Sequence, residues 1–225
     1  MKPKILLVCC DGLENGGIQA VIMSIVKNLH VEYDFHAIVF SDGNQYYTDE
    51  FLKYGSIHTF KRFKGNNKLT KVFEDVINYI FYLTQIKEFL NNDDDYIAIH
   101  CHNYFESGPF LKIANKYGIN KRIAHSHNVA PPYKRKNPVY NIIEKIYKNM
   151  IHKYATERVA CSAAAGEYLF GFDKTLVIPN AIDLQKFNPN NYSNEQSNNL
   201  KFVHVGRYSY QKNQVFLLEV FKELL

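Results

Sequence analysis

Two stretches decide the fold that this chain is predicted to adopt, Arg122-Ile-Ala-His-Ser-His-Asn128 and Ile97-Ala-Ile-His-Cys-His-Asn103. Each is a short apolar run that ends in His-x-His-Asn, and such a run bounded by polar residues predicts a buried parallel strand. Side chains alternate between the two faces of a strand, so the two histidines of each stretch share a face. In open α/β sheets, ligands bind outside the carboxyl ends of the strands. The repeated pattern therefore predicts a site at two strand ends.

Imidazoles and amides make up this predicted site: His100, His102, Asn103, His125, His127 and Asn128. One alternative is that a given histidine only caps a strand end through hydrogen bonds, although the repeat disfavours this for all four together. A second alternative is a zinc site, since imidazole is a good zinc ligand. Metal-bound histidines usually belong to a closed tetrahedral set with further partners behind them, so we expect no metal.

Hydrophobic periodicity around these stretches predicts an α/β fold with a mostly parallel sheet. Apolar residues recur at helical spacing between short apolar runs, as in a Rossmann-like domain. The predicted strands are 4–9, 35–40, 56–60, 96–101, 121–125, 157–162 and 175–178, and the predicted helices are 18–29, 49–54, 71–90, 108–117, 139–154 and 163–170.

A glycine-containing loop lies between the first predicted strand and the first predicted helix. Gly16 and Gly17 immediately precede that helix. Glycines there let the backbone approach a ligand closely, and the helix N-terminus favours an anion. The spacing of Gly12, Gly16 and Gly17 is not the dinucleotide fingerprint Gly-x-Gly-x-x-Gly. An ordinary tight turn remains the alternative.

Composition limits the classes of protein to consider. The chain has 225 residues, of which 46% are apolar and 22% charged, with a net charge of +5. This mildly basic balance suits anionic ligands or a lipid surface, but it is not the signature of a nucleic-acid-binding protein. The four cysteines show neither zinc-ribbon nor disulfide spacing, which favours a reducing compartment. No apolar segment has the length needed to span a membrane.

A change in composition predicts a domain boundary. Residues 188–199 are polar and asparagine-rich, as expected of a linker. We therefore predict an N-terminal domain over 1–187 and an incomplete second domain over 200–225. The second begins with a strand at 200–205, followed by a basic turn and an apolar helix.

The motifs of the chain resemble those of family-4 retaining glycosyltransferases of the GT-B fold. The resemblance rests on Gly16-Gly17, on Val177-Ile-Pro-Asn-Ala-Ile-Asp-Leu-Gln-Lys-Phe187 and on Val205-Gly-Arg-Tyr-Ser-Tyr-Gln-Lys-Asn213. The first His-rich stretch above and Ala160-Cys-Ser-Ala-Ala-Ala-Gly166 are similar to the branch that builds bacterial capsular polysaccharides and exopolysaccharides. The combination of motifs is specific, whereas any one of them is not.

The resemblance implies two Rossmann-like domains, an N-terminal one for the acceptor and a C-terminal one for the nucleotide-sugar. It places Gly17, with Gly16, beside the donor phosphates, His127 beside the transferred sugar, and Arg207 and Lys212 on the donor diphosphate. Cations and backbone N–H groups stabilise the charge that develops on a departing nucleoside diphosphate, without a metal. The resemblance also implies retention of anomeric configuration, no metal and no cofactor besides the nucleotide-diphosphate sugar as co-substrate.

The expected function is therefore sugar transfer from a nucleotide-diphosphate donor to a polyprenyl-diphosphate-linked acceptor. The family's Glu-x7-Glu motif would lie beyond residue 225, so we expect little transfer by this chain alone. A non-catalytic acceptor- or membrane-binding half of a split enzyme is the alternative. We expect a cytoplasmic protein that contacts the inner face of an anionic membrane through the basic residues at 61–68 and 134–136. Ordinary solvated surface is the alternative for those cations.

Overall fold

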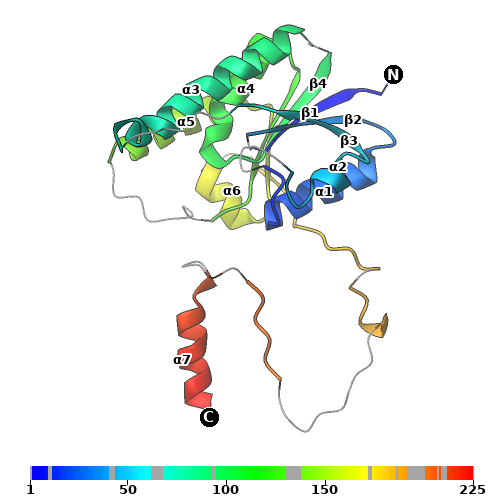
Figure 1. The fold of residues 1–225 in the computed structure, drawn as a ribbon, viewed down its shortest axis with the longest axis vertical. Coiled ribbons are helices and arrows are strands. Elements are labelled where there is room, and N and C mark those ends of the chain that lie inside the picture. The colour runs from blue at the N-terminus through cyan, green and yellow to red at the C-terminus, as the bar shows by residue number, and fades with distance from the viewer. Residues whose placement is uncertain are drawn as a thin grey trace. The chain divides into compact units, whose positions relative to one another are not determined.

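A computed structural model describes most of the chain (Figure 1). The described residues are 2–9, 12–40, 44–61, 68–92, 95–129, 138–171, 174–185, 187–191, 201–206, 208 and 212–224. They divide into two compact units, one within 1–130 and 137–181 and the other within 131–136 and 182–225. The linker and domain bounds set out above stay predictions.

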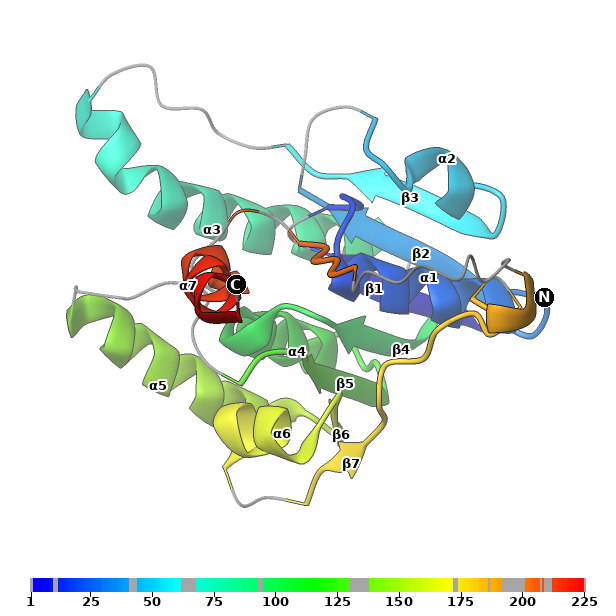
Figure 2. The ribbon, with the colours of Figure 1, turned by 90° about the horizontal axis from the view of Figure 1, so that it is seen from below.

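A seven-stranded sheet forms the centre of the first unit. The strands are β1 (Lys4–Cys9), β2 (Asp34–Val39), β3 (Gly55–Thr59), β4 (Tyr96–Cys101), β5 (Lys121–Ser126), β6 (Glu157–Ala160) and β7 (Leu176–Val177). Their order is β3-β2-β1-β4-β5-β6-β7, and Figure 2 shows it from β3 at the top to β7 at the bottom. Every neighbouring pair is parallel. The predicted α/β fold with a mostly parallel sheet is confirmed.

Helices cover the two faces of this sheet because each carries an apolar side toward it. They are α1 (Gly17–Leu29), α2 (Thr48–Phe51), α3 (Lys68–Asn92), α4 (Ser107–Lys116), α5 (Pro138–Tyr154) and α6 (Ala163–Phe170), with a 3-10 turn η1 (Tyr104–Glu106) before α4. One buried cluster joins α3, α4, α5 and α6 to one face of the sheet. The other cluster joins α1 and α2 to the opposite face.

Helix α4 ends in a cap at Gly118. This glycine has φ +75°, in the left-handed region where a side chain is strained. Its N–H donates to the Asn115 carbonyl, and the N–H of Ile119 donates to the Ala114 carbonyl. This pair of bonds satisfies carbonyl groups that the last turn leaves open, which is the Schellman arrangement. The turn then leads directly into β5.

Gly108 sets the close approach of α4 and α5. A Cβ added there would lie within 3.0 Å of the Met150 Cβ and closer still to the Tyr147 carbonyl oxygen. Backbone cannot move aside as a flexible side chain can. We therefore expect Gly108→Ala to lower the free energy of unfolding by about 1–3 kcal/mol. Urea denaturation measures the change, with Gly17→Ala as control because a Cβ on Gly17 meets nothing within 4 Å. Equal stability of the two variants would contradict this packing.

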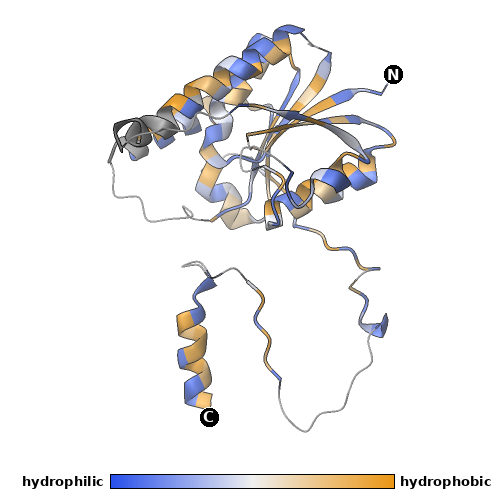
Figure 3. Cartoon of the chain, in the orientation of Figure 1, coloured by the Kyte–Doolittle hydropathy of each residue, from blue (hydrophilic) through white to orange (hydrophobic). Residues whose placement is uncertain are grey.

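The second unit contains a short 3-10 turn η2 (Pro189–Asn191) and the helix α7 (Gln214–Leu224). The predicted C-terminal helix is confirmed, and Figure 3 shows its many apolar residues. The strand predicted at 200–205 is wrong for the described residues 201–205, which have no regular structure. A strand is stable only when it is paired in a ladder, and no described segment of this unit pairs with 201–206.

Candidate functional site

The carboxyl ends of β1, β4 and β5 meet at one edge of the sheet, because all neighbouring strands are parallel. Strands β2 and β3 lie on one side of β1, and β4 to β7 lie on the other side. The direction in which successive strands are added to the sheet therefore reverses between β1 and β4. In open α/β sheets this reversal is where ligands bind. The glycine loop follows β1, His102 and Asn103 follow β4, and His127 and Asn128 follow β5. The predicted site residues that belong to the first unit therefore lie at the carboxyl edge of the sheet.

The two histidines of each stretch share a face, as predicted, and the register of β4 and β5 puts all four on the same face of the sheet. His100 is the partner of Leu7 in β1, which belongs to the cluster beneath α1 and α2. Cys101 and Ala124 lie on the opposite face, in the cluster that packs against α3, α4, α5 and α6. The ring centroids of His100 and His102 are 4.1 Å apart, as are those of His125 and His127. Each ring is therefore in contact with its neighbours in a continuous imidazole cluster.

Hydrogen bonds join the cluster across the two strands in pairs. His100 Nε2 lies 3.2 Å from His125 Nδ1, and His102 Nδ1 lies 2.9 Å from His127 Nε2. One ring of each pair donates an N–H and the other accepts it. Three further nitrogens of the cluster are buried and have no partner among the residues that the structure describes: His102 Nε2, His125 Nε2 and His127 Nδ1. Buried polar atoms normally have a partner, so these three nitrogens are candidates to bond a ligand's polar groups.

Burial keeps these imidazoles uncharged at neutral pH. It lowers the pKa of His100 to about 3, with a smaller contribution from the charge of His127. It lowers the pKa of His127 to about 4 and holds the pKa values of His102 and His125 below 6.5 as well. A neutral imidazole offers one donor and one acceptor. The cluster is therefore suited to hydroxyl groups and not to balancing the charge of a diphosphate.

The end of β5 is fixed from β6 and α6. The Ser126 hydroxyl donates to the Ala165 carbonyl at 2.6 Å, and the Cys161 N–H donates to the Ser126 carbonyl at 3.0 Å. The Cys161 thiol lies 3.6 Å from the His127 carbonyl. These contacts hold the backbone on both sides of the His127 side chain, which positions its ring against His102.

The glycine loop after β1 is held by two glutamines that the sequence did not single out. Gly12 has φ +71°, and its carbonyl accepts a bond from Gln19 Nε2 at 3.2 Å. Gln45, from the segment after β2, accepts from the Leu13 N–H and donates to Glu14 at 3.0 Å. Nothing in the pattern around Gln45 signals this role, because its partner lies 31 residues away along the chain.

Gly16 and Gly17 begin α1 at the predicted place. Gly16 is the N-cap and supplies no side-chain bond, and the first turn carries no acidic residue. The first N–H groups of a helix lack partners within it, so they are available to an anion. A Cβ on Gly17 would meet nothing within 4 Å, so its surface is open to a ligand. These features agree with a phosphate-binding turn but do not by themselves identify one.

The two predicted cations of the donor side fall outside the first unit or outside the described residues. Lys212 is exposed and lies in the second unit, whose placement relative to the first is not determined. Its aliphatic chain lies beside Gly206, where an added Cβ would come within 3.3 Å of it. Arg207 lies outside the described residues. Their roles stay predictions.

Sequence reasoning missed a polar cluster beside η1. The Tyr104 hydroxyl donates to Glu144 at 2.6 Å, and Lys148 pairs with the same carboxylate at 2.9 Å. The Lys148 ammonium lies 4.7 Å from the ring centre of Tyr168, which stacks on Tyr104. The i,i+4 spacing of Glu144 and Lys148 was the available signal. This cluster anchors η1, and with it the turn after Asn103, to α5 and α6.

No helix among the described residues has the length and apolar character needed to cross a membrane.

Comparisons with known proteins add a family to this geometry. Residues 15–186 match the profile of Glycosyltransferase Family 4. EpsF of Bacillus subtilis (strain 168), which carries the name of a glycosyltransferase, is 23% identical over 96% of this chain and 57% of its own length. The capsular polysaccharide biosynthesis glycosyltransferase CapH of Staphylococcus aureus is 24% identical over 94% of this chain and 56% of its own. The chain thus spans about half the length of these relatives.

Solved structures agree on the fold. Anabaena Alr3699/HepE, crystallised with UDP and glucose, has a TM-score of 0.56 and 16% identity, over 81% of this chain and 46% of its own. A UDP-N-acetylglucosamine 2-epimerase has a TM-score of 0.51 and 16% identity, over 78% of this chain and 46% of its own. Because a transferase-family sequence shares this architecture with an epimerase, the fold alone does not select the reaction.

Proposed function

We propose, from the premise that the chain belongs to glycosyltransferase family 4, that it acts in the transfer of a sugar from a nucleotide-diphosphate donor to a lipid-linked acceptor during capsular polysaccharide or exopolysaccharide synthesis. The observation that carries the proposal is the cluster of four neutral imidazoles at the edge that also holds the glycine loop. The cluster suits sugar hydroxyls, and the loop suits phosphates. CapH is named for capsular polysaccharide biosynthesis, and HepE was crystallised with UDP.

The proposed roles follow the chemistry of each group. His100, His102, His125, Asn103 and Asn128 bind hydroxyls of the acceptor. His127 presents its unpartnered nitrogen to the transferred sugar. Gly16 and Gly17 donate N–H groups to the donor phosphates, and Arg207 and Lys212 stabilise the charge of the leaving diphosphate without a metal. The reaction retains the anomeric configuration of the sugar.

A chimera tests the proposal, because the relatives extend well beyond the matched region. This chain would replace the aligned region of CapH, and the product would be incubated with labelled UDP-, GDP- and dTDP-sugars and polyprenyl-diphosphate-linked sugars. Label should pass to the lipid from at least one donor, and the product should keep the donor's anomeric configuration. A folded chimera that transfers nothing, while CapH itself is active, would rule the proposal out.

The lipid acceptor places the site at the inner face of the cytoplasmic membrane. Helix α5 supports contact there, since Ile142 and Ile146 are 61% and 46% exposed while Ile143 and Tyr147 pack on the core. The apolar residues of α5 are therefore divided between the core and the surface. Residues Lys134–Lys136, just before this helix, lie outside the described residues.

Reversal of charge at this segment should weaken membrane binding. Each cation near an anionic leaflet contributes about 1 kcal/mol, so Lys134→Glu/Arg135→Glu/Lys136→Glu should bind anionic vesicles on the order of 100-fold more weakly at low salt. Sedimentation with vesicles measures this. The control, Lys53→Glu/Lys87→Glu/Lys116→Glu, makes the same charge change at exposed lysines elsewhere. Equal binding of the two variants would contradict a specific role for the segment.

A further inference from the structure

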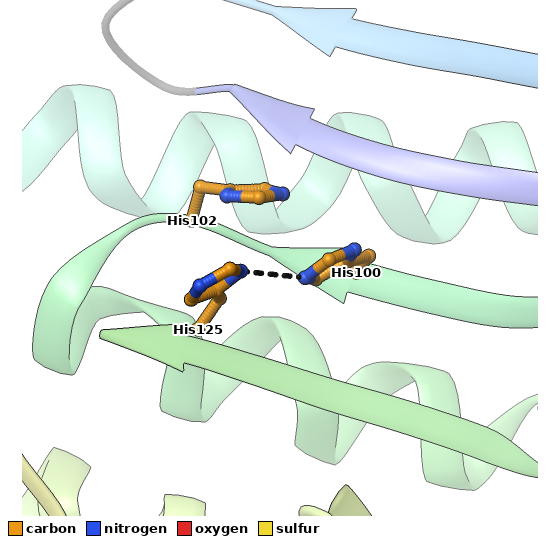
Figure 4. A group of neighbouring side chains, drawn as sticks. All are labelled: His100, His102 and His125. Carbon is orange, nitrogen blue, oxygen red and sulfur yellow. Dashed lines mark hydrogen bonds between the residues drawn. The ribbon is translucent and has the colours of Figure 1, made fainter. Parts of the chain in front are cut away.

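Three imidazoles of the cluster have the arrangement of metal ligands. His100, His102 and His125 each offer one nitrogen, and these nitrogens all lie within 4.8 Å of one another. Figure 4 shows His100 on β4, His102 just after that strand and His125 on β5 lying close together, with the His100–His125 bond dashed. His102 and His125 are only 5% and 4% exposed, so the strands and the neighbouring rings hold them in place.

Protons alone cannot satisfy this cluster. A neutral imidazole has one N–H and one bare nitrogen, so each hydrogen-bonded pair keeps one N–H and one bare nitrogen on its outer sides. For the His102–His127 pair both outer nitrogens are buried without a partner, and so is the outer nitrogen of His125. Exchanging tautomers only moves the unpaired N–H from one ring to the other. A ligand that accepts the lone pair of His102 Nε2 would give that nitrogen a partner.

We propose that His100, His102 and His125 bind a divalent ion of the Zn²⁺ class. Two nitrogens on a tetrahedral ion with bonds of about 2.0 Å lie about 3.3 Å apart, and His100 Nε2 and His125 Nδ1 are already 3.2 Å apart. The ion replaces the proton that these two nitrogens share. The third nitrogen needs a turn of the His102 ring about its side-chain bonds, because separations in the group extend toward 4.8 Å.

The surroundings favour this class of ion. Imidazole ligands select Zn²⁺ and its transition-metal neighbours, whereas Mg²⁺ and Ca²⁺ require oxygen ligands. His127 holds His102 Nδ1 at 2.9 Å, which is the kind of second contact that orients a metal-binding imidazole. Burial lowers the pKa values of the three rings, so protons do not compete with the metal at neutral pH.

This site would be inhibitory and not part of the transfer reaction. The ion occupies the same three imidazoles that the proposed function assigns to acceptor hydroxyls, so metal and acceptor would compete for His100, His102 and His125. The binding of the ion itself depends on the geometry of the three rings and not on sugar transfer. The two proposals therefore fail or succeed in separate experiments.

Metal titration of the 225-residue chain tests the inference. The protein, free of any His-tag and treated with chelator, would be titrated with Zn²⁺ against a chromophoric chelator, and with Co²⁺ by visible absorption. We expect one equivalent of Zn²⁺ to bind and Co²⁺ to give the intense bands of a tetrahedral site. Binding of less than half an equivalent, or only the weak bands of octahedral Co²⁺, would overturn the proposal without reference to any variant.

A matched pair of variants locates the site. His100→Gln/His125→Gln should weaken Zn²⁺ binding at least 100-fold, because glutamine is a poor Zn²⁺ ligand. The control His36→Gln/His58→Gln removes another stacked and hydrogen-bonded imidazole pair, at 3.0 Å, and should bind as wild type does. Near-UV circular dichroism checks that each variant is folded. If His100→Gln/His125→Gln does not fold, the single variant His102→Gln replaces it in the Zn²⁺ titration. Equal affinity of the cluster variant and the control would overturn the assignment.

Discussion

Lowering the pH from 6.5 to 4.5 should remove on the order of 5 kcal/mol from the free energy of unfolding of the metal-free chain through His100 and His127 alone. The reason is that burial depresses the pKa of His100 to about 3 and that of His127 to about 4, below the ordinary 6.5 of the unfolded chain. In this range the unfolded state binds protons that the folded state does not. Each such imidazole destabilises the folded state by about 1.4 kcal/mol per pH unit.

The sign of this effect is fixed by the direction of the shifts. Above pH 6.5 both states hold neutral imidazoles, so the full stability is present. As the pH falls from 6.5 toward 4 and 3, stability is lost, and below the folded pKa values the loss levels off. Carboxylates that titrate in the same range add their own pH dependence, so the comparison must be made between variants.

Urea denaturation at half-unit steps of pH, in chelator, measures the slope. His100→Gln/His127→Gln should reduce the dependence of stability on pH between 4.5 and 6.5, since two of the four imidazoles with a depressed pKa are gone. The control His152→Gln removes an exposed imidazole from α5 and should keep the wild-type slope. If the cluster variant and the control have the same slope, the imidazoles are not buried in neutral form as described.

The sheet and the shared face of the histidines were predictable because both depend on local pattern. A strand has a side-chain period of two, so His100 with His102, and His125 with His127, had to share a face wherever the strands lay. The carboxyl edge of a parallel sheet then brings the two stretches to one place.

The pairing of the rings was not predictable, since it depends on register between strands. His100 has Ile123 as its partner in β5, so its ring reaches His125 as a diagonal neighbour. A shift of the register by one residue would put His125 on the other face of the sheet relative to it. Sequence reasoning gave four imidazoles at one edge, but not which nitrogen meets which.

Contacts between segments far apart in the sequence could not be predicted from the local hydrophobic pattern either. Gln45 reaches the glycine loop from the segment after β2, and Tyr104 reaches Glu144 over 40 residues. The wrong strand at 200–205 has a related cause: alternating apolar residues suit a strand, but a strand also needs a partner to pair with. Val203 and Val205 are 85% and 87% exposed in the second unit.

Replacing His127 by alanine should reduce sugar transfer by the CapH chimera on the order of 10²-fold. The reason lies in the position of its ring at the end of β5. Nε2 is bound to His102 Nδ1 at 2.9 Å, which fixes the ring, and Nδ1 is buried without a partner. A fixed group that bonds the reacting sugar needs no reorganisation in the transition state, so its loss should lower kcat more than it raises KM for the donor.

Two further variants distinguish a role of His127 in the reaction from a merely structural role. His127→Gln keeps a side-chain amide that can bond a hydroxyl, and we expect it to recover part of the lost rate. The control His58→Gln changes an imidazole on β3, away from the cluster, and should transfer sugar as the parent chimera does. Because burial lowers the pKa of His127 to about 4, the ring acts in its neutral form, and the rate should show no loss attributable to its protonation between pH 6 and 8. Full activity of folded His127→Ala would remove this residue from the reacting centre.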